Sequence, residues 1–298
     1  MDITFGLTGT CRRWDQRMTQ LLAIVEWLES VLNSAFAIAI LGGFVGAAGG
    51  ALAAQQIAER VKRREDLLKE LRNTNAAIVV SFSICNAGMA LKKQHVQPMH
   101  EQFGKEKELL HEFLAKRSKG IIPANAEHQI AADLRSYPAP TTALETLKGL
   151  VFEKISAYGR ALALVSVLDQ SLVGLREAIA KRDAWAHRFS SGGIPKNTFQ
   201  HYYLGLQLPS GDTNQEYPDL IFAIHSYTDD VIFFSSLLCA DLIKHGEAVR
   251  EPLTRKSENG VPRVSTADFA GPRASGLLPP DDQYADWLNG FTEQKAAT

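Results

Sequence analysis

The chain has 298 residues, with 32 basic and 33 acidic side chains and a formal net charge of -1 at pH 7. This balance argues against a nucleic-acid partner, because nucleic-acid binders usually show a basic excess or stripe. A hydrophobic content of 45% suits a packed core but is too low for a transporter with many spans, and the three cysteines are too widely spaced for a disulfide framework or a CxxC metal site.

Residues 1–30 form the first predicted segment of the chain. The spacing of apolar residues predicts an amphipathic helix over 11–29. Apolar residues recur there at steps of three and four, the spacing of one helix face: Met18, Leu21, Leu22, Val25 and Leu28. Trp14 and Trp27 carry amphipathic rings of the kind found at the headgroup level of a bilayer. We therefore expect this helix to lie in the plane of a membrane interface.

A long uncharged stretch follows. No charged side chain occurs between Glu29 and Glu59, and its apolar centre covers residues 31–54. This centre exceeds the roughly 20 residues that a helix needs to cross a hydrocarbon core of about 30 Å. We predict one transmembrane helix over 31–54, in contact with the lipid bilayer. The alternatives are a secretory signal peptide, which normally starts closer to the N-terminus, and a buried helix rich in alanine and glycine.

The basic residues are distributed unevenly on the two sides of this stretch. Three precede it (Arg12, Arg13 and Arg17), whereas six follow it (Arg60, Lys62, Arg63, Arg64, Lys69 and Arg72). The positive-inside rule places the side with more Lys and Arg in the cytoplasm. We therefore expect a single-pass protein of a bacterial-type inner membrane, with the C-terminal domain in the cytoplasm.

Small residues recur at every fourth position of the predicted membrane helix: Gly42, Gly46, Gly50 and Ala54. A spacing of four keeps them on one helix face, and a face without bulk lets two membrane helices approach closely. The pattern predicts a homo-oligomer formed through this helix, of undefined number. The alternative is that glycine and alanine are simply common in membrane helices.

Residues 55–250 are predicted to form a cytoplasmic helical domain that begins with a long helix. Its stretch 73–91 lacks charge, and we interpret it as the most buried part of that helix; a second membrane crossing is the alternative. Pro98 should kink or interrupt the helix. The glycine and proline residues within 117–141 then predict an irregular link.

Two further long helices are expected, over 142–189 and from about Pro218 to Arg250. The first carries a sustained apolar seam typical of a coiled coil. A long loop over 190–216 separates them, and the tail 251–298 is rich in proline and glycine, with a short docking helix predicted near Trp287. The fold class predicted is all-α, with long antiparallel helices in a bundle or extended coiled coil.

Arg182 and His187 form the spacing R-x4-H in the segment RDAWAH. This spacing resembles the signature of HEPN ribonucleases, which are all-helical. The resemblance implies that Arg182 would stabilise phosphate charge and His187 would move a proton. The alternative is a solvated helix end, where Lys181, Arg182, His187 and Arg188 complement the helix dipole.

Two histidine–carboxylate pairs lie at i, i+4: His225 with Asp229, and Asp241 with His245. Each pair would need a third ligand to bind a metal, so we expect surface pairing or core hydrogen bonds and predict no metal or cofactor. The sequence also lacks the common motifs of nucleoside triphosphatases, dehydrogenases, zinc proteases and α/β hydrolases.

The architecture predicts a membrane-anchored helical scaffold or sensor, rather than an enzyme, that self-associates and presents its cytoplasmic domain to a protein partner. One alternative is a membrane-disrupting effector of a bacterial defence or toxin system, in which the glycine-rich helix perturbs the bilayer. The other is the HEPN-like ribonuclease. These hypotheses rest on architecture and one short motif, so the local geometry of the sites has to decide among them.

Overall fold

The computed structural model describes these parts of the chain: 11–32, 35–123, 125–255 and 259–291. For part of 11–48 it describes the backbone only. The chain divides into two compact units, Met1–Glu65 and Asp66–Thr298. Within the described ranges the structure is helical and contains no strand, which confirms the all-α prediction.

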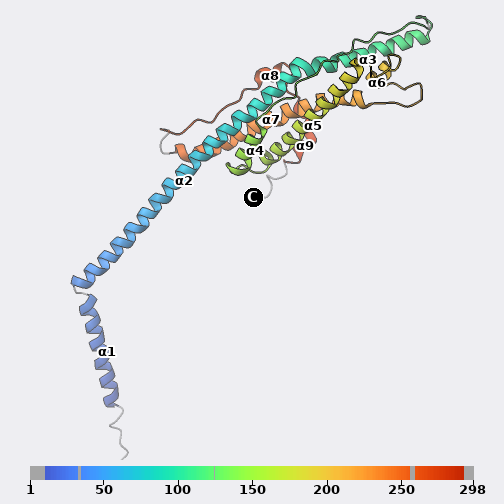
Figure 1. Ribbon diagram of the computed structural model, residues 1–298. Helices are drawn as coiled ribbons and strands as arrows, with labels where there is room; N and C mark the ends of the chain where they lie inside the picture. The colour runs from blue at the N-terminus through green and yellow to red at the C-terminus, as the bar shows by residue number, and fades with distance from the viewer. Residues whose placement is uncertain (1–10, 33–34, 124, 256–258, 292–298) are drawn as a thin grey trace, which may run out of the picture. The chain divides into compact units, whose positions relative to one another are not determined.

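The helices are joined by turns and irregular segments (Figure 1). In chain order they are α1 (Cys11–Leu32), α2 (Ala35–Leu91), the π-helical turn η1 (Lys92–Val96), α3 (Gln97–Ser118), α4 (Leu144–Glu153), α5 (Arg160–Ser190), α6 (Phe199–Leu204), α7 (Glu216–Thr254), α8 (Ala270–Ala274), the 3-10 turn η2 (Asp281–Tyr284) and α9 (Ala285–Asn289).

The core of the unit Asp66–Thr298 is built on long helices that lie side by side, among them α5 and α7 (Figure 1). Arg160 at the start of α5 forms an ion pair with Asp241 late in α7. At the other end, the ring of Phe189 lies 5.1 Å from the ring of Tyr217 at the start of α7. The two helices are therefore antiparallel, and the bundle prediction is confirmed.

The uncharged stretch 73–91 of α2 packs against α7 through small side chains. The Ser81 hydroxyl donates a hydrogen bond to the carbonyl of Ser235, and the Cys85 thiol to that of Ile232. A Cβ on Gly88 would lie 3.0 Å from Ile232, so glycine allows this close approach. Burial raises the pKa of the Cys85 thiol to about 12. The interpretation of this stretch as the most buried part of α2 agrees with these contacts, and Cys85 is a small core residue.

The helix is not completely broken at Pro98. The π-helical turn η1 leads directly into α3, and Pro98 lies in the first turn of α3. Proline offers no N–H to the preceding turn and its ring crowds that turn. In η1 the N–H of Gln97 bonds to the carbonyl of Lys92, one residue further back than in an α-helix. The predicted interruption is therefore a widened helical turn.

The prediction of one helix over 142–189 is wrong, because α4 ends at Glu153 and α5 starts at Arg160. Contacts from α2 stabilise the turn between them. Glu70 accepts hydrogen bonds from the backbone N–H and the hydroxyl of Ser156. Gly159 adopts a positive φ of 60°, which glycine tolerates without a Cβ clash. The predicted seam is broken here, and Tyr158 in this turn is 84% exposed.

The remaining predicted segments match the structure more closely. Helix α7 covers the expected third helix, and the irregular link precedes α4. The loop 190–216 contains the short helix α6. In the tail, α9 forms where a docking helix was predicted, and the Trp287 ring lies 5.0 Å from that of Phe234 in α7. Helix α9 thus packs against α7 of the bundle.

Candidate functional site

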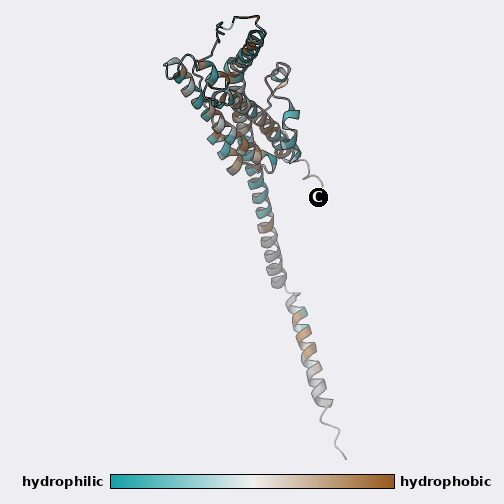
Figure 2. Cartoon of the chain, turned by 90° about the vertical axis from the view of Figure 1, so that its right-hand side faces the viewer, coloured by the Kyte–Doolittle hydropathy of each residue, from teal (hydrophilic) through white to brown (hydrophobic). Residues whose placement is uncertain are grey.

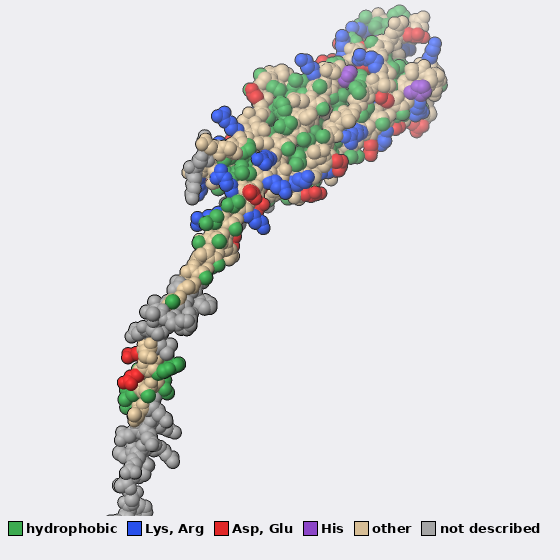
Figure 3. Space-filling model, turned by 60° about the vertical axis from the view of Figure 1, so that its left-hand side comes forward, with side chains coloured by type: hydrophobic (Ala, Val, Ile, Leu, Met, Phe, Trp, Pro, Cys, Tyr) green, Lys and Arg blue, Asp and Glu red, His purple; other side chains and the backbone are tan. Residues whose placement is uncertain are grey.

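The described side chains of the unit Met1–Glu65 leave a large apolar surface exposed. In α1, Leu22 is 60% exposed and Trp27 is 65% exposed, and further along Leu52 in α2 is 62% exposed. Figure 2 shows apolar residues on the described part of α1 in brown, and Figure 3 shows green side chains on the same unit open to solvent. Apolar side chains left in water are a favourable surface for a lipid or protein contact.

The four residues of the predicted association face lie in α2. The surroundings of Gly42 lie outside the described residues, whereas Gly46, Gly50 and Ala54 are exposed. A Cβ built on Gly46 or Gly50 would meet no atom within 4 Å. Within a single chain, therefore, the small size of Gly46 and Gly50 is not required by any described neighbour.

One continuous helical stretch of the described residues, Gly49–Ser118, is long and apolar enough to cross a membrane. Half of its most apolar 18-residue window is buried within the protein. A helix in the core of a soluble domain therefore fits that window as well as a membrane helix does. Most side chains over 31–48, where the anchor is predicted, lie outside the described residues.

Arg182 is a fully buried arginine in α5, so the alternative interpretation of a solvated helix end is wrong for this residue. Its guanidinium donates hydrogen bonds to the backbone carbonyls of Asp133 and Arg135. It also lies 4.4 Å from the centre of the Tyr137 ring and bonds to Asp183 at 3.2 Å. Arg182 thus clamps the irregular segment before α4 onto the bundle.

The clamp extends to the segment's own side chains. The guanidinium of Arg135 binds Asp133 at 2.7 and 2.9 Å, and the Tyr137 hydroxyl donates to the same carboxylate. These bonds, chiefly the one from Arg135, hold the pKa of Asp133 well below its usual value. The Asp133 N–H donates to the hydroxyl of Tyr203 in α6. The network fixes the backbone of this segment.

The structure does not bring Arg182 and His187 into one site. Arg182 is buried and its charge is directed at backbone carbonyls, whereas His187 is exposed on the surface of α5. Five residues along a helix correspond to about one and a half turns, which places them on different faces. In this arrangement the Arg182 guanidinium serves the backbone carbonyls of Asp133 and Arg135, and the RNA-cleaving role of the pair stays a hypothesis.

The pair Asp241 and His245 is likewise separated. Asp241 binds the guanidinium of Arg160 at 2.6 and 2.8 Å, and His245 lies 3.0 Å from the carboxylate of Glu70. Both are contacts between helices rather than within α7. This agrees with the expectation of core hydrogen bonds and adds Glu70 and Arg160, which sequence reasoning missed.

The pair His225 and Asp229 belongs to a larger polar cluster beside η1. Lys92, 9% exposed, forms an ion pair with Asp229 at 2.7 Å. The His225 ring nitrogen lies 3.8 Å from the other Asp229 oxygen, and the rings of His225 and His100 lie 4.4 Å apart. Lys92 and His100, on η1 and α3, thereby meet two residues of α7.

A surface cavity of about 330 Å³ opens beside this cluster. His225, Asp229, Asp230 and Tyr284 are among the residues that line it. The Tyr284 hydroxyl donates to Asp230 at 2.9 Å, while burial raises the pKa of the Asp230 carboxyl. The cluster combines two imidazoles with two carboxylates, and imidazole is the side chain whose ordinary pKa lies near neutral pH.

Sequence reasoning found only half of this cluster, because Lys92 and His100 are far from α7 along the chain. The available signal was a lysine at the end of the uncharged stretch, followed by Pro98. Proline inside a helical pattern disturbs the preceding turn, and single π turns within helices frequently occur at functional sites. We take the cluster as the candidate functional site of the helical unit.

Acidification is expected to weaken the contact between α3 and α7 at this cluster. Burial, with the nearby His225, lowers the pKa of His100 below its usual 6.5. The unfolded chain therefore binds the proton more readily, and the stability from neutral His100 falls as the pH drops below about 6.5. The free energy of unfolding, measured in urea at about pH 7.5 and at about pH 5, should therefore fall less for the variant His100→Asn than for the native chain.

His111 provides the matched control, since it is exposed on the same helix α3. His111→Asn should retain the full pH dependence of the native chain. Equal pH dependence for the native chain and His100→Asn would contradict the assignment.

Among the residues that the structure describes, no group of three or more histidine, cysteine, aspartate or glutamate side chains is arranged to hold a metal ion. The chemistry that the geometry of the cluster at η1 supports is a pH-sensitive contact between helices. Comparison of the chain with protein-family models, curated proteins and solved structures finds no match.

Proposed function

We propose that this protein is a membrane-anchored helical scaffold or sensor. Residues 31–54 cross the bilayer as a single helix, and the unit Asp66–Thr298 faces the cytoplasm, where it is presented to a protein partner. The observation that carries the proposal is the absence of charge between Glu29 and Glu59, next to a helix whose described apolar side chains are exposed.

Energetics support a lipid contact for this region. Fully burying a Leu, Val or Ile side chain is worth about 1.5–3 kcal/mol. Leu21, Leu22 and Leu52 are each more than half exposed. An extended helix that keeps such residues in water forgoes this stabilisation. Insertion into hydrocarbon recovers it, and the helix satisfies its own backbone hydrogen bonds there.

The helical unit has the properties of a binding module. It is held by buried networks around Arg182 and along α2 and α7, and the cluster at η1 joins two of its helices through titratable groups. A rigid bundle with one adjustable contact suits a sensor, because a change at that contact shifts the balance between two arrangements.

Extraction experiments test the anchor directly. Membranes from cells that express the full-length chain are washed with alkaline carbonate and then with detergent. The protein should remain in the carbonate pellet and dissolve only in detergent. Release by carbonate would contradict an integral anchor and would favour a buried helix over 31–54.

Self-association is expected to depend on the small-residue face of the same helix. Gly46→Leu should reduce chemical crosslinking between copies in membranes by about tenfold, because bulk on this face keeps two helices apart. No described atom lies near a Cβ at this position, so the single chain has room for the new side chain.

The matched control is Ala48→Leu, because position 48 is two residues from both Gly46 and Gly50 and therefore lies on the opposite face of the helix. It should preserve crosslinking. Equal crosslinking of the native chain and Gly46→Leu would remove the association face from the proposal while leaving the anchor intact.

A further inference from the structure

A surface cavity of about 500 Å³, which we call the α3–α6 cavity, lies where three segments far apart in the sequence meet. Its walls are the last part of α3, the irregular segment 126–128 and the stretch 196–200, which leads into α6. The volume is within the range of sites that bind small organic molecules. This cavity shares no lining residue with the cavity beside the cluster at η1.

The walls of the α3–α6 cavity are held in place by contacts among the same segments. The Gln200 side chain of α6 donates a hydrogen bond to the carbonyl of His128 at 2.6 Å. The ring of Phe113 in α3 lies 5.2 Å from that of His128. The N–H and the hydroxyl of Thr198 both donate to the carbonyl of Pro195, which fixes the turn before α6. The cavity is therefore preformed, and a ligand does not have to order these segments.

One part of the lining is apolar and aromatic. Leu110 belongs to the bundle core, whereas Leu114 is exposed. Phe113 packs against the core and places its ring next to that of His128. Aromatic rings pack on one another in offset or edge-to-face arrangements and bury a large apolar area. Two rings beside leucine side chains therefore favour a flat aromatic body.

The same cavity carries basic groups. Arg117 and Lys196 line it and are exposed, and Glu127 is the acidic side chain among the described lining residues. Within the described ranges neither Arg117 nor Lys196 forms an ion pair with a protein carboxylate, whereas the neighbouring Lys116 pairs with Glu112 at 3.6 Å. The lining therefore keeps an excess of one positive charge. Arginine can bind a carboxylate through two parallel hydrogen bonds.

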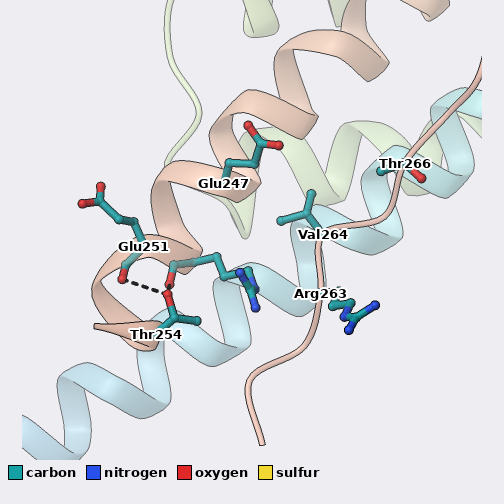
Figure 4. Close-up of a pocket in the computed structure, with 7 residues that line it drawn as sticks. Glu247, Glu251, Thr254, Arg263, Val264 and Thr266 are labelled. Atoms are coloured by element: carbon teal, nitrogen blue, oxygen red, sulfur yellow. Dashed lines mark hydrogen bonds between the residues drawn. The ribbon is translucent and has the colours of Figure 1, made fainter. Parts of the chain in front are cut away.

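The cavity shown in Figure 4 has a similar size but a different balance of charge. It lies between the last turns of α7 and residues 263–266, and its volume is about 520 Å³. Glu247 and Glu251 are matched there by Arg250 and Arg263. That cavity offers no excess charge to a ligand, whereas the α3–α6 cavity combines an excess of positive charge with an apolar wall.

We propose that the α3–α6 cavity binds a small molecule with an aromatic body and one anionic group. The aromatic body lies against Leu110, Phe113 and Leu114. The carboxylate, sulfonate or phosphate group is bound by Arg117 and Lys196. The cavity lies within Asp66–Thr298, so this proposal goes beyond the membrane-anchored scaffold and does not depend on the anchor.

Two fluorescent dyes separate the two halves of such a ligand. Anilinonaphthalene sulfonate has the aromatic body and an anionic group, whereas phenylnaphthylamine has the same body without the sulfonate. Each is titrated into the full-length chain in detergent. Micelles take up each dye to the same extent in every sample, so a difference between protein variants reports the cavity. The sulfonate dye should bind the native chain with a dissociation constant of about 100 µM or below, as expected for its size.

Removing the two cations tests the anionic half. Arg117→Gln combined with Lys196→Gln should weaken binding of the sulfonate dye at least about tenfold and leave binding of the neutral dye unchanged. The matched control, Lys105→Gln with Lys181→Gln, removes the same net charge at exposed positions outside the cavity and should bind both dyes like the native chain. Equal binding of the sulfonate dye by the native chain and the Arg117→Gln, Lys196→Gln variant would overturn the proposal.

Filling the cavity tests its location. Ala126→Trp places a large side chain in the lining and should abolish the binding of both dyes that exceeds uptake by micelles. Gln129→Trp is the control, because position 129 is exposed and lies outside the lining. Equal binding by these two variants, with equal helicity, would overturn the proposal. If Ala126→Trp disturbs folding, the exposed substitutions at 117 and 196 decide the question alone.

Discussion

Replacing Arg182 with leucine should destabilise the helical unit more than any exposed substitution on α5. The change removes the guanidinium that donates to the partly buried carbonyls of Asp133 and Arg135. A hydrogen bond from a charged group contributes about 1.5–3 kcal/mol, so we expect the loss of both to cost about 3 kcal/mol or more. For a unit of this size, that lowers the thermal midpoint by roughly 6–12 °C.

Circular dichroism melting of the full-length chain in detergent measures this effect. Lys181→Leu is the matched control, because Lys181 is the exposed neighbour of Arg182. Its midpoint should stay within about 2 °C of the native value. A midpoint for Arg182→Leu that equals the control would show that the segment before α4 does not depend on the clamp.

Placing charges in the predicted membrane helix should remove the protein from the membrane. We expect Gly43→Asp combined with Gly46→Asp to shift most of the chain from the membrane pellet to the soluble fraction. One charged side chain at the centre of a membrane helix costs about 2.5–3.5 kcal/mol, so two cost about 5–7 kcal/mol. A cost of this size exceeds a thousandfold change in the insertion equilibrium.

The control replaces the same two glycines with alanine. No described atom lies within 4 Å of a Cβ at either position, so neither pair of substitutions clashes within one chain. The alanine variant should remain in the membrane pellet. If the aspartate variant also remained there, the region would not be a hydrocarbon-spanning helix.

The long helices were predictable because their signals are local. The uncharged stretch 73–91 of α2 and the apolar centre of α7 give continuous patterns that tertiary contacts do not override. Pro98 likewise marks its own turn, although the pattern cannot distinguish a π turn from a break. What a pattern reports is therefore the presence of a helix and its buried face.

The break between α4 and α5 was not predictable for the opposite reason. Ser156 and Lys154 give up helical hydrogen bonds because Glu70 and Asn73 of α2 supply others, from more than 80 residues away in the chain. The same distance hides the role of Arg182. Its position in α5 suggests an exposed helix end, and only the segment folded against it shows that it is buried.

The candidate site at η1 was half predictable. His225 and Asp229 share a face of α7 and were singled out as a pair by their spacing. Lys92 and His100 come from helices whose approach to α7 depends on the whole bundle. Single-sequence spacing finds residues on one element, whereas a site assembled from three elements requires their packing.

The most direct test of the account is the accessibility of two cysteines in intact cells. Cys11 and a cysteine introduced by Ala274→Cys are probed with a membrane-impermeant maleimide, since Cys85 and Cys239 are buried. The account predicts that Cys11 reacts from outside, whereas the cysteine at 274 reacts only after the membrane is permeabilised. Labelling of both or neither in intact cells, or recovery of the chain as a soluble protein, would contradict an anchor over 31–54 with a cytoplasmic helical unit.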